Sequence, residues 1–75
     1  MRRYTLLLIS DAEEGGHTVR VPALPGLTPE GDTLEEAIAN ARDAITLRMK
    51  SAEKHGEPIP EEELPPRTVT IDVAA

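Results

Sequence analysis

The chain has 75 residues, a formal net charge of −6, and no Cys, Trp or Phe. A chain this short holds a single hydrophobic core, so residues 1–75 are expected to form one domain. Without cysteine it has no disulfide or thiol redox chemistry, which fits a cytoplasmic protein. The negative charge repels phosphate, which argues against direct binding of nucleic acid and favours a basic protein partner.

The low aromatic content predicts self-association. Tyr4 is the one aromatic residue, so Leu, Ile, Val and Ala must build the core, and the apolar area available for burial is limited. Domains of this size often need a disulfide, a metal or a partner subunit. The sequence has no cysteine and no histidine-rich cluster. We therefore expect a homo-oligomer, either a dimer or a tetramer.

The N-terminal run Tyr4–Ile9 predicts a strand. Two arginines precede it, as in a signal peptide, but its apolar stretch is shorter than the roughly 7–15 residues of a signal sequence or the about 20 of a membrane span. No membrane association is expected. Apolar side chains fall on both alternating faces of the run, which is typical of a central strand.

A second strand is predicted over His17–Val21. Its apolar and polar residues alternate, so one face is expected to be buried and the other wet. The pair Gly15-Gly16 precedes it and can take the positive φ angles of a tight turn. The short connection predicts an antiparallel hairpin with the first strand.

The segment Val21–Thr33, here named the joint, carries three prolines and two glycines. Pro22 and Pro25 lack the N–H that a strand ladder needs, so the second strand should end there, and the sequence Pro-Gly after it is typical of a tight turn. A short third strand is expected over Leu27–Glu30. Its proline places it at an edge of the sheet.

One long helix is predicted over Thr33–His55. Thr33 and Glu36 fit a capping box at its start, and Gly56 is a typical stop. Apolar residues recur at helical spacing and predict the face that packs on the sheet. These residues are Leu34, Ala37, Ile38, Ala41, Ala44, Ile45, Met49 and Ala52.

Residues 57–66 are rich in proline and glutamate and predict an irregular, extended connection. The alternating segment Arg67–Val73 then predicts a fourth strand. A helix between the first and fourth strands implies a right-handed crossover, which makes these two strands parallel neighbours. The expected architecture is α+β: β-β-β-α-β along the chain, with one mixed sheet in the order 3-2-1-4 and the helix packed on one face.

Catalytic motifs are not evident. The glycine pair is not followed by a phosphate-binding helix, and no spacing links Ser10 or Ser51 to His17 or His55 as a nucleophile and its base. Four carboxylates could in principle converge on a divalent metal and make a residual metal-dependent nuclease. They are Asp11, Glu35, Glu36 and Asp72. Because two of them have capping roles, we expect no enzyme activity, no metal and no cofactor.

Several motifs together resemble the HicB family of antitoxins. The resemblance lies in Val21-Pro22-Ala23-Leu24-Pro25-Gly26, in Gly31-Asp32-Thr33-Leu34-Glu35-Glu36-Ala37, in Ala41-Arg42-Asp43-Ala44-Ile45 and in Gly56-Glu57-Pro58-Ile59-Pro60, with Tyr4 and Gly15-Gly16 extending it. It implies a degenerate, partial RNase H-like fold whose nuclease site is lost. It also implies a function, which is to bind and neutralise HicA, a small basic RNA-cleaving toxin.

Charge alone selects the candidate partner-binding residues, which are Glu13, Glu14, Glu61, Glu62 and Glu63. Many HicB proteins also carry a C-terminal DNA-binding segment. The sequence stops directly after the predicted fourth strand, so we expect a HicB-like domain without that segment and without operator binding. A stand-alone oligomeric binding or structural module with another client is the alternative.

Overall fold

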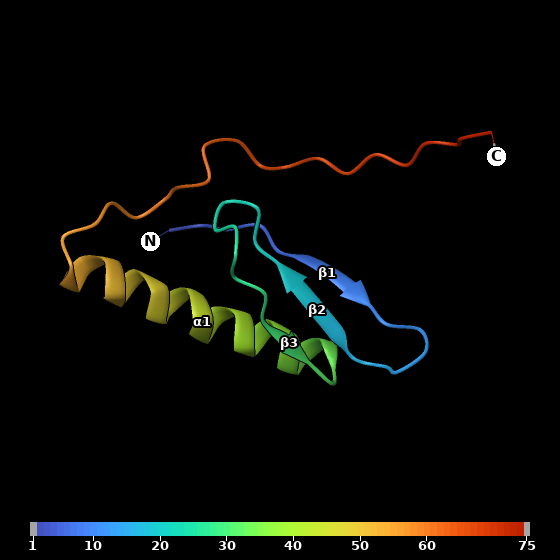
Figure 1. The fold of residues 1–75 in the computed structure, drawn as a ribbon, viewed down its shortest axis with the longest axis horizontal. Coiled ribbons are helices and arrows are strands. Elements are labelled where there is room, and N and C mark those ends of the chain that lie inside the picture. The colour runs from blue at the N-terminus through green and yellow to red at the C-terminus, as the bar shows by residue number, and fades with distance from the viewer. Residues whose placement is uncertain (1, 75) are drawn as a thin grey trace.

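The structure is a computed structural model, and it describes residues 2–74. It contains three strands and one helix, namely β1 (Leu7–Ser10), β2 (His17–Arg20), β3 (Glu30–Gly31) and α1 (Leu34–Lys54). The strands form one antiparallel sheet in the order β1-β2-β3, and α1 packs against it (Figure 1). The expected α+β class with a single helix is confirmed.

β1 and β2 form the predicted hairpin, with Leu8 opposite Val19 and Ser10 opposite His17. The first strand was expected to be central, but β2 is the central strand of the three, because it pairs with both β1 and β3. The third strand begins later than expected, at Glu30. Leu27 is still part of a turn, because its N–H donates to the carbonyl of Leu24. Pro29 has no N–H to donate, although its carbonyl accepts a hydrogen bond of 2.7 Å from the N–H of Val19.

The helix matches its expected bounds. Thr33 is the N-cap, and its hydroxyl accepts a hydrogen bond of 3.1 Å from the N–H of Glu36. His55 is the C-cap and Gly56 follows it with a φ of 66°, as expected for a helix stop. The residues of α1 that are buried are Ala37, Ala41, Ile45 and Ala52. Three of these four are alanines, so the helix axis can lie close to the sheet.

The joint supplies the centre of the core. Leu24 and Val19 are the largest side chains that are fully buried, and they pack with Val21 against the alanine face of α1. Two backbone hydrogen bonds fold the joint into consecutive turns: the N–H of Leu24 donates to the carbonyl of Val21, and the N–H of Leu27 donates to that of Leu24. The prolines thus end β2 as expected and turn the chain back over the helix.

Gly31 allows the closest approach between sheet and helix. A Cβ atom at this position would lie 2.4 Å from the backbone nitrogen of Ala37. Backbone atoms cannot move aside as the end of a flexible side chain can, so only glycine fits here. This contact fixes the start of α1 against β3.

Residues 57–74, here named the arm, contain no helix or strand. The fourth strand expected over Arg67–Val73 is therefore not formed, and the full order 3-2-1-4 is not confirmed. Val69, Ile71 and Val73 are 80%, 73% and 77% exposed. Figure 1 shows the arm leaving the end of α1, crossing above the N-terminal segment and running outward beyond the sheet. Its root is tethered in a position that carries these residues past β1, as described below.

Candidate partner-binding surface

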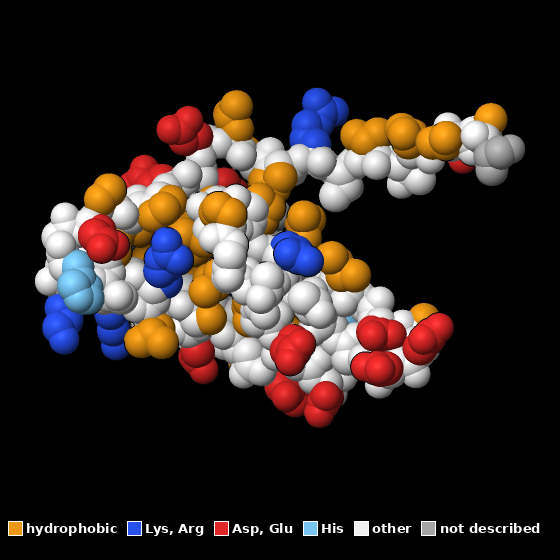
Figure 2. Space-filling model, in the orientation of Figure 1, with side chains coloured by type: hydrophobic (Ala, Val, Ile, Leu, Met, Phe, Trp, Pro, Cys, Tyr) orange, Lys and Arg blue, Asp and Glu red, His pale blue; other side chains and the backbone are white. Residues whose placement is uncertain are grey.

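Acidic side chains gather at one end of the molecule, over the β1–β2 turn, β3 and the start of α1. We name this surface the acidic end. Its members are all exposed, and they are Asp11, Glu13, Glu14, Glu30, Asp32, Glu35 and Glu36. Figure 2 shows the carboxylates at the lower right, over the hairpin turn and the beginning of the helix. Arg20 is the single Lys or Arg between residues 11 and 36, so the negative charge is almost unopposed.

The sheet itself brings these carboxylates together. β2 pairs with β1 on one side and with β3 on the other, with His17 opposite both Ser10 and Gly31. The β1–β2 turn therefore ends beside the short segment that leads from β3 into α1. Glu35 and Glu36 lie in the first turn of α1, where negative charge is favoured by the positive end of the helix dipole.

Asp11 organises the β1–β2 turn that carries Glu13 and Glu14. One oxygen of its carboxylate accepts hydrogen bonds from the N–H groups of Glu13 and Glu14, at 2.9 and 3.0 Å. These two bonds, that from Glu14 first, lower the pKa of the Asp11 carboxyl below its ordinary value of 3.8, because they favour the charged form. The turn is therefore held in one shape by an ionised side chain, and two glutamates project from it.

The opposite end of α1 carries positive charge. Arg48, Lys50 and Lys54 are exposed there, and the ring of His55 donates a hydrogen bond of 2.8 Å to the carbonyl of Ser51. Lys and Arg side chains show at the left of Figure 2, away from the acidic end. The helix thus carries opposite charges at its two ends, each opposing the helix dipole.

The structure separates the five glutamates selected from the sequence. Glu13 and Glu14 lie at the acidic end, whereas Glu61, Glu62 and Glu63 lie at the root of the arm. Nothing in the sequence alone placed Glu30 and Asp32 beside Glu13 and Glu14, because that proximity comes from the pairing of β2 with β3. The short third strand predicted over Leu27–Glu30 was the only sequence signal for this pairing.

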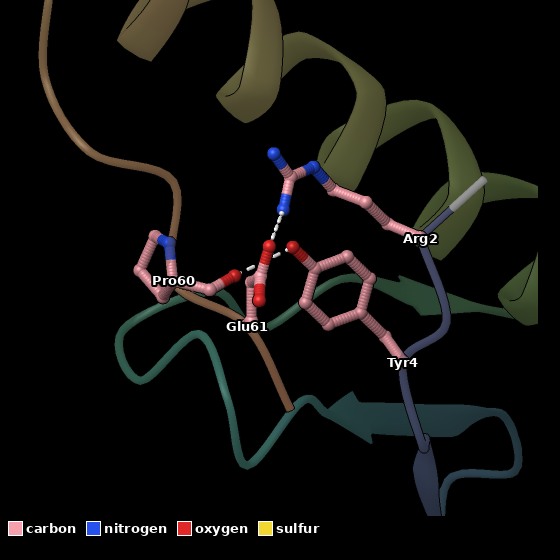
Figure 3. Close-up of polar contacts among 4 residues, drawn as sticks. All are labelled: Arg2, Tyr4, Pro60 and Glu61. Atoms are coloured by element: carbon pink, nitrogen blue, oxygen red, sulfur yellow. Dashed lines mark hydrogen bonds and ion pairs between the residues drawn. The ribbon is translucent and has the colours of Figure 1, made fainter. Parts of the chain in front are cut away.

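Two of the arm glutamates have partners within the molecule. Glu61 forms an ion pair of 2.6 Å with Arg2, and the hydroxyl of Tyr4 donates to the carbonyl of Pro60 at 2.7 Å (Figure 3). The carboxylate of Glu62 accepts hydrogen bonds from the N–H and the hydroxyl of Thr5, at 2.7 and 2.8 Å. Glu61 and Glu62 therefore tether the arm. Glu61 and Glu63 are exposed, and Glu62 is partly buried.

Ser10 and His17, which no sequence spacing links, are brought together by the hairpin register. The hydroxyl of Ser10 and Nδ1 of His17 share a hydrogen bond of 2.9 Å. Both residues lie on regular strand backbone at the end of the hairpin, and Ser10 is exposed. The pair forms a polar contact across two strands.

The four carboxylates considered for a metal site lie on different parts of the molecule. Asp11 is in the hairpin turn, Glu35 and Glu36 begin α1, and Asp72 is on the arm. Within residues 2–74, no three His, Asp or Glu side chains come close enough together to hold a metal ion. The acidic side chains of the described residues are thus spread over the surface and are not gathered at one point.

The chain belongs to the family of HicB-like antitoxins of bacterial toxin-antitoxin systems, whose pattern matches residues 4–70. It is similar to UPF0150 protein Ta0767 of Thermoplasma acidophilum, with 43% identity over 58 residues that cover 77% of this chain and 83% of the relative. It is also similar to UPF0150 protein ssr1765 of Synechocystis, with 38% identity over 68 residues that cover 91% of this chain and 85% of the relative. No solved structure matches the chain significantly.

The resemblance noted in the joint and helix is thereby confirmed, and with it a role in a toxin-antitoxin system. Helix α1 is not of the kind that crosses a bilayer, and in the described part of the chain there is no helix both long and apolar enough to do so.

Proposed function

We propose that this domain is an antitoxin that binds a small, basic, RNA-cleaving toxin of the HicA type and holds it inactive. Family membership supports a toxin partner. The observation that carries the proposal further is the acidic end, where seven exposed carboxylates lie at one end of the molecule. A toxin that grips RNA must present positive charge to phosphate, and the same charge fits this surface.

The proposed contact is centred on Glu13 and Glu14 and extends over the start of α1. Asp11 holds the turn that presents these two glutamates, so little ordering is required when the partner binds. Glu63 adds a second, smaller contact from the arm root, with Glu61 and Glu62 beside it. The inhibition is steric and electrostatic: the domain covers the RNA-binding face of the toxin in the cytoplasm and catalyses nothing itself.

The fold that completes this function is proposed to be RNase H-like in the order 3-2-1-4. Three of its strands are those described above, and the fourth is the segment Arg67–Val73.

Charge reversal at the acidic end tests the proposal. The full chain is co-expressed with the small basic protein encoded next to its gene, and toxin binding and relief of growth arrest are measured. We expect E13K/E14K to weaken toxin binding about tenfold to a hundredfold, because each substitution replaces attraction with repulsion. The matched control is E53K/E57K, which changes the net charge equally but lies at the other end of α1 and should bind nearly as well as the parent.

Failure of the neighbouring protein to co-purify, or growth arrest that persists in its presence, would overturn the antitoxin function. Equal loss of binding in both charge-reversed variants would overturn the acidic end as the contact surface.

A further inference from the structure

The arm is extended and apolar on one face, yet within residues 2–74 it is paired with no strand. Val69, Ile71 and Val73 alternate with Thr68, Thr70 and Asp72 and lie exposed on it. A segment with this alternation has the pattern of a half-buried strand. Figure 2 shows the outer part of the arm standing clear of the hairpin, with a wide gap between them.

The tether at Glu62 prevents the arm from supplying this strand to its own β1. Glu62 is held at Thr5. Arg67 follows Glu62 by five positions, just as Ser10 follows Thr5 by five. Extended residues each advance about 3.3 Å. An arm running along β1 from this tether would therefore bring Arg67 level with Ser10, where β1 ends, and carry the alternating segment past it.

The part of the arm that would lie level with β1 is poorly suited to pairing. It contains Pro65 and Pro66, which have no N–H to give to a ladder. Within residues 2–74, β1 is paired with β2 alone, so its other edge carries backbone groups open to a further strand.

A groove lies beside this free edge. It has a volume of about 850 Å³ and runs between the N-terminal segment and α1, with Tyr4, Leu6, Ile38, Ile45 and Met49 among its lining residues. Leu6 directly precedes β1, so a strand added along that edge would place alternate side chains over the groove. Arg2, Arg3 and Arg42 also line the groove, and the apolar face of the alternating segment has the chemistry to fill its apolar part.

We propose that two copies of this chain exchange arms, so that Arg67–Val73 of each pairs with the free edge of β1 in the other. The apolar side chains Val69, Ile71 and Val73 enter the groove of the second copy, and Thr70 faces outward with Ile9. Each sheet then has the order 3-2-1-4, with the fourth strand supplied by the partner. The exchange is isologous, since both copies give an arm and receive one. It goes beyond the proposed function and does not depend on toxin binding.

Cross-linking between chains of different mass tests the exchange directly. The natural sequence has no cysteine, so introduced ones are the only thiols. An isotope-labelled I9C chain is mixed with an unlabelled T70C chain and treated with a short bismaleimide. We expect the mixed cross-linked dimer to be the main product by mass spectrometry. Cross-linking confined to single chains of an I9C/T70C double variant would show the arm on its own β1 and overturn the proposal, as would the absence of both products.

Light scattering gives a second measurement. The natural chain should have the mass of a dimer at micromolar concentration, and a monomer there would overturn the exchange. I71D, which places a charge in the groove, should raise the dimer dissociation constant at least about tenfold. The control T70D alters the outward face of the same segment and should remain dimeric. The arm lies outside the core, so both variants should keep their helical circular dichroism, and a dimer insensitive to I71D would place self-association elsewhere.

Discussion

The joint and the arm are the two proline-rich regions of the chain, and they fold in opposite ways. The joint contains three prolines and the arm contains four. Each also has a leucine between prolines, yet Leu24 in the joint is 1% exposed, whereas Leu64 in the arm is 84% exposed. Similar local composition has therefore produced the centre of the core in one region and a free extended segment in the other.

The difference lies in how each region is held. The joint is fixed at both ends, by β2 before it and by α1 after it. Within it, β3 pairs with β2, and the carbonyl of Pro29 accepts a hydrogen bond from the N–H of Val19. The polar contacts that hold the arm lie at its root, at Pro60, Glu61 and Glu62. The prolines interrupt regular structure in both regions. Leu24 is packed because the joint is held at two ends, next to the small side chains of α1.

Truncation of the two leucines should give the largest contrast. L24A removes a fully buried side chain beside the alanine face of α1 and should lower the free energy of unfolding by about 3 kcal/mol. L64A removes an exposed side chain and should change it by less than about 0.5 kcal/mol. Urea denaturation followed by circular dichroism measures both. Comparable losses in the two variants would mean that the arm is packed in solution as firmly as the joint.

Closing the approach between β3 and α1 should have the next largest effect. G31A places a Cβ atom against the backbone of Ala37 and should cost about 2 kcal/mol of unfolding free energy, because neither backbone can move without disturbing the core. The control is G15A. The Cβ atom that this variant adds would meet no atom within 4 Å, but Gly15 has a φ of 76°. Backbone strain alone should therefore act there, and it should lower the free energy of unfolding by about 1 kcal/mol. A Gly31 variant as stable as the parent would show that the joint is not held by this contact.

Release of the arm root should have the smallest effect. E62A removes both hydrogen bonds to Thr5 and should cost about 1 kcal/mol, since the group is only partly buried and water can replace the lost acceptor. The amide of Thr5 should exchange with deuterium faster in this variant. The control E63A changes an exposed neighbour and should alter neither the free energy of unfolding nor the exchange rate of the Thr5 amide. If the exchange rate at Thr5 is unchanged in E62A, the tether is refuted.

Local signals were enough to predict most of the fold. Helix α1 was recognisable because Thr33, Gly56 and the spacing of its apolar residues depend on neighbours a few positions away. The hairpin followed from Gly15-Gly16 and the alternation after it. The fourth strand had equally good local alternation, yet it is not formed, because the position of Arg67–Val73 depends on a tether between Glu62 and Thr5 that are 57 residues apart.

The candidate surface was only partly predictable for the same reason. Glu13 and Glu14 could be selected from charge, but their neighbours at the acidic end come from β3 and α1, and only the register of β2 with β3 brings them together. Glu61 and Glu62 looked equally available in the sequence. Their partners Arg2 and Thr5 lie at the other end of the chain, so their structural role had no local signal.

The absence of Trp and Phe has a practical consequence at the arm root. Tyr4 is the only fluorophore of the chain, and its hydroxyl donates a hydrogen bond to the carbonyl of Pro60. All intrinsic fluorescence of the protein therefore comes from the root of the arm. The natural protein carries its own optical probe of arm docking, and release or exchange of the arm can be followed in unlabelled material as a change in tyrosine emission.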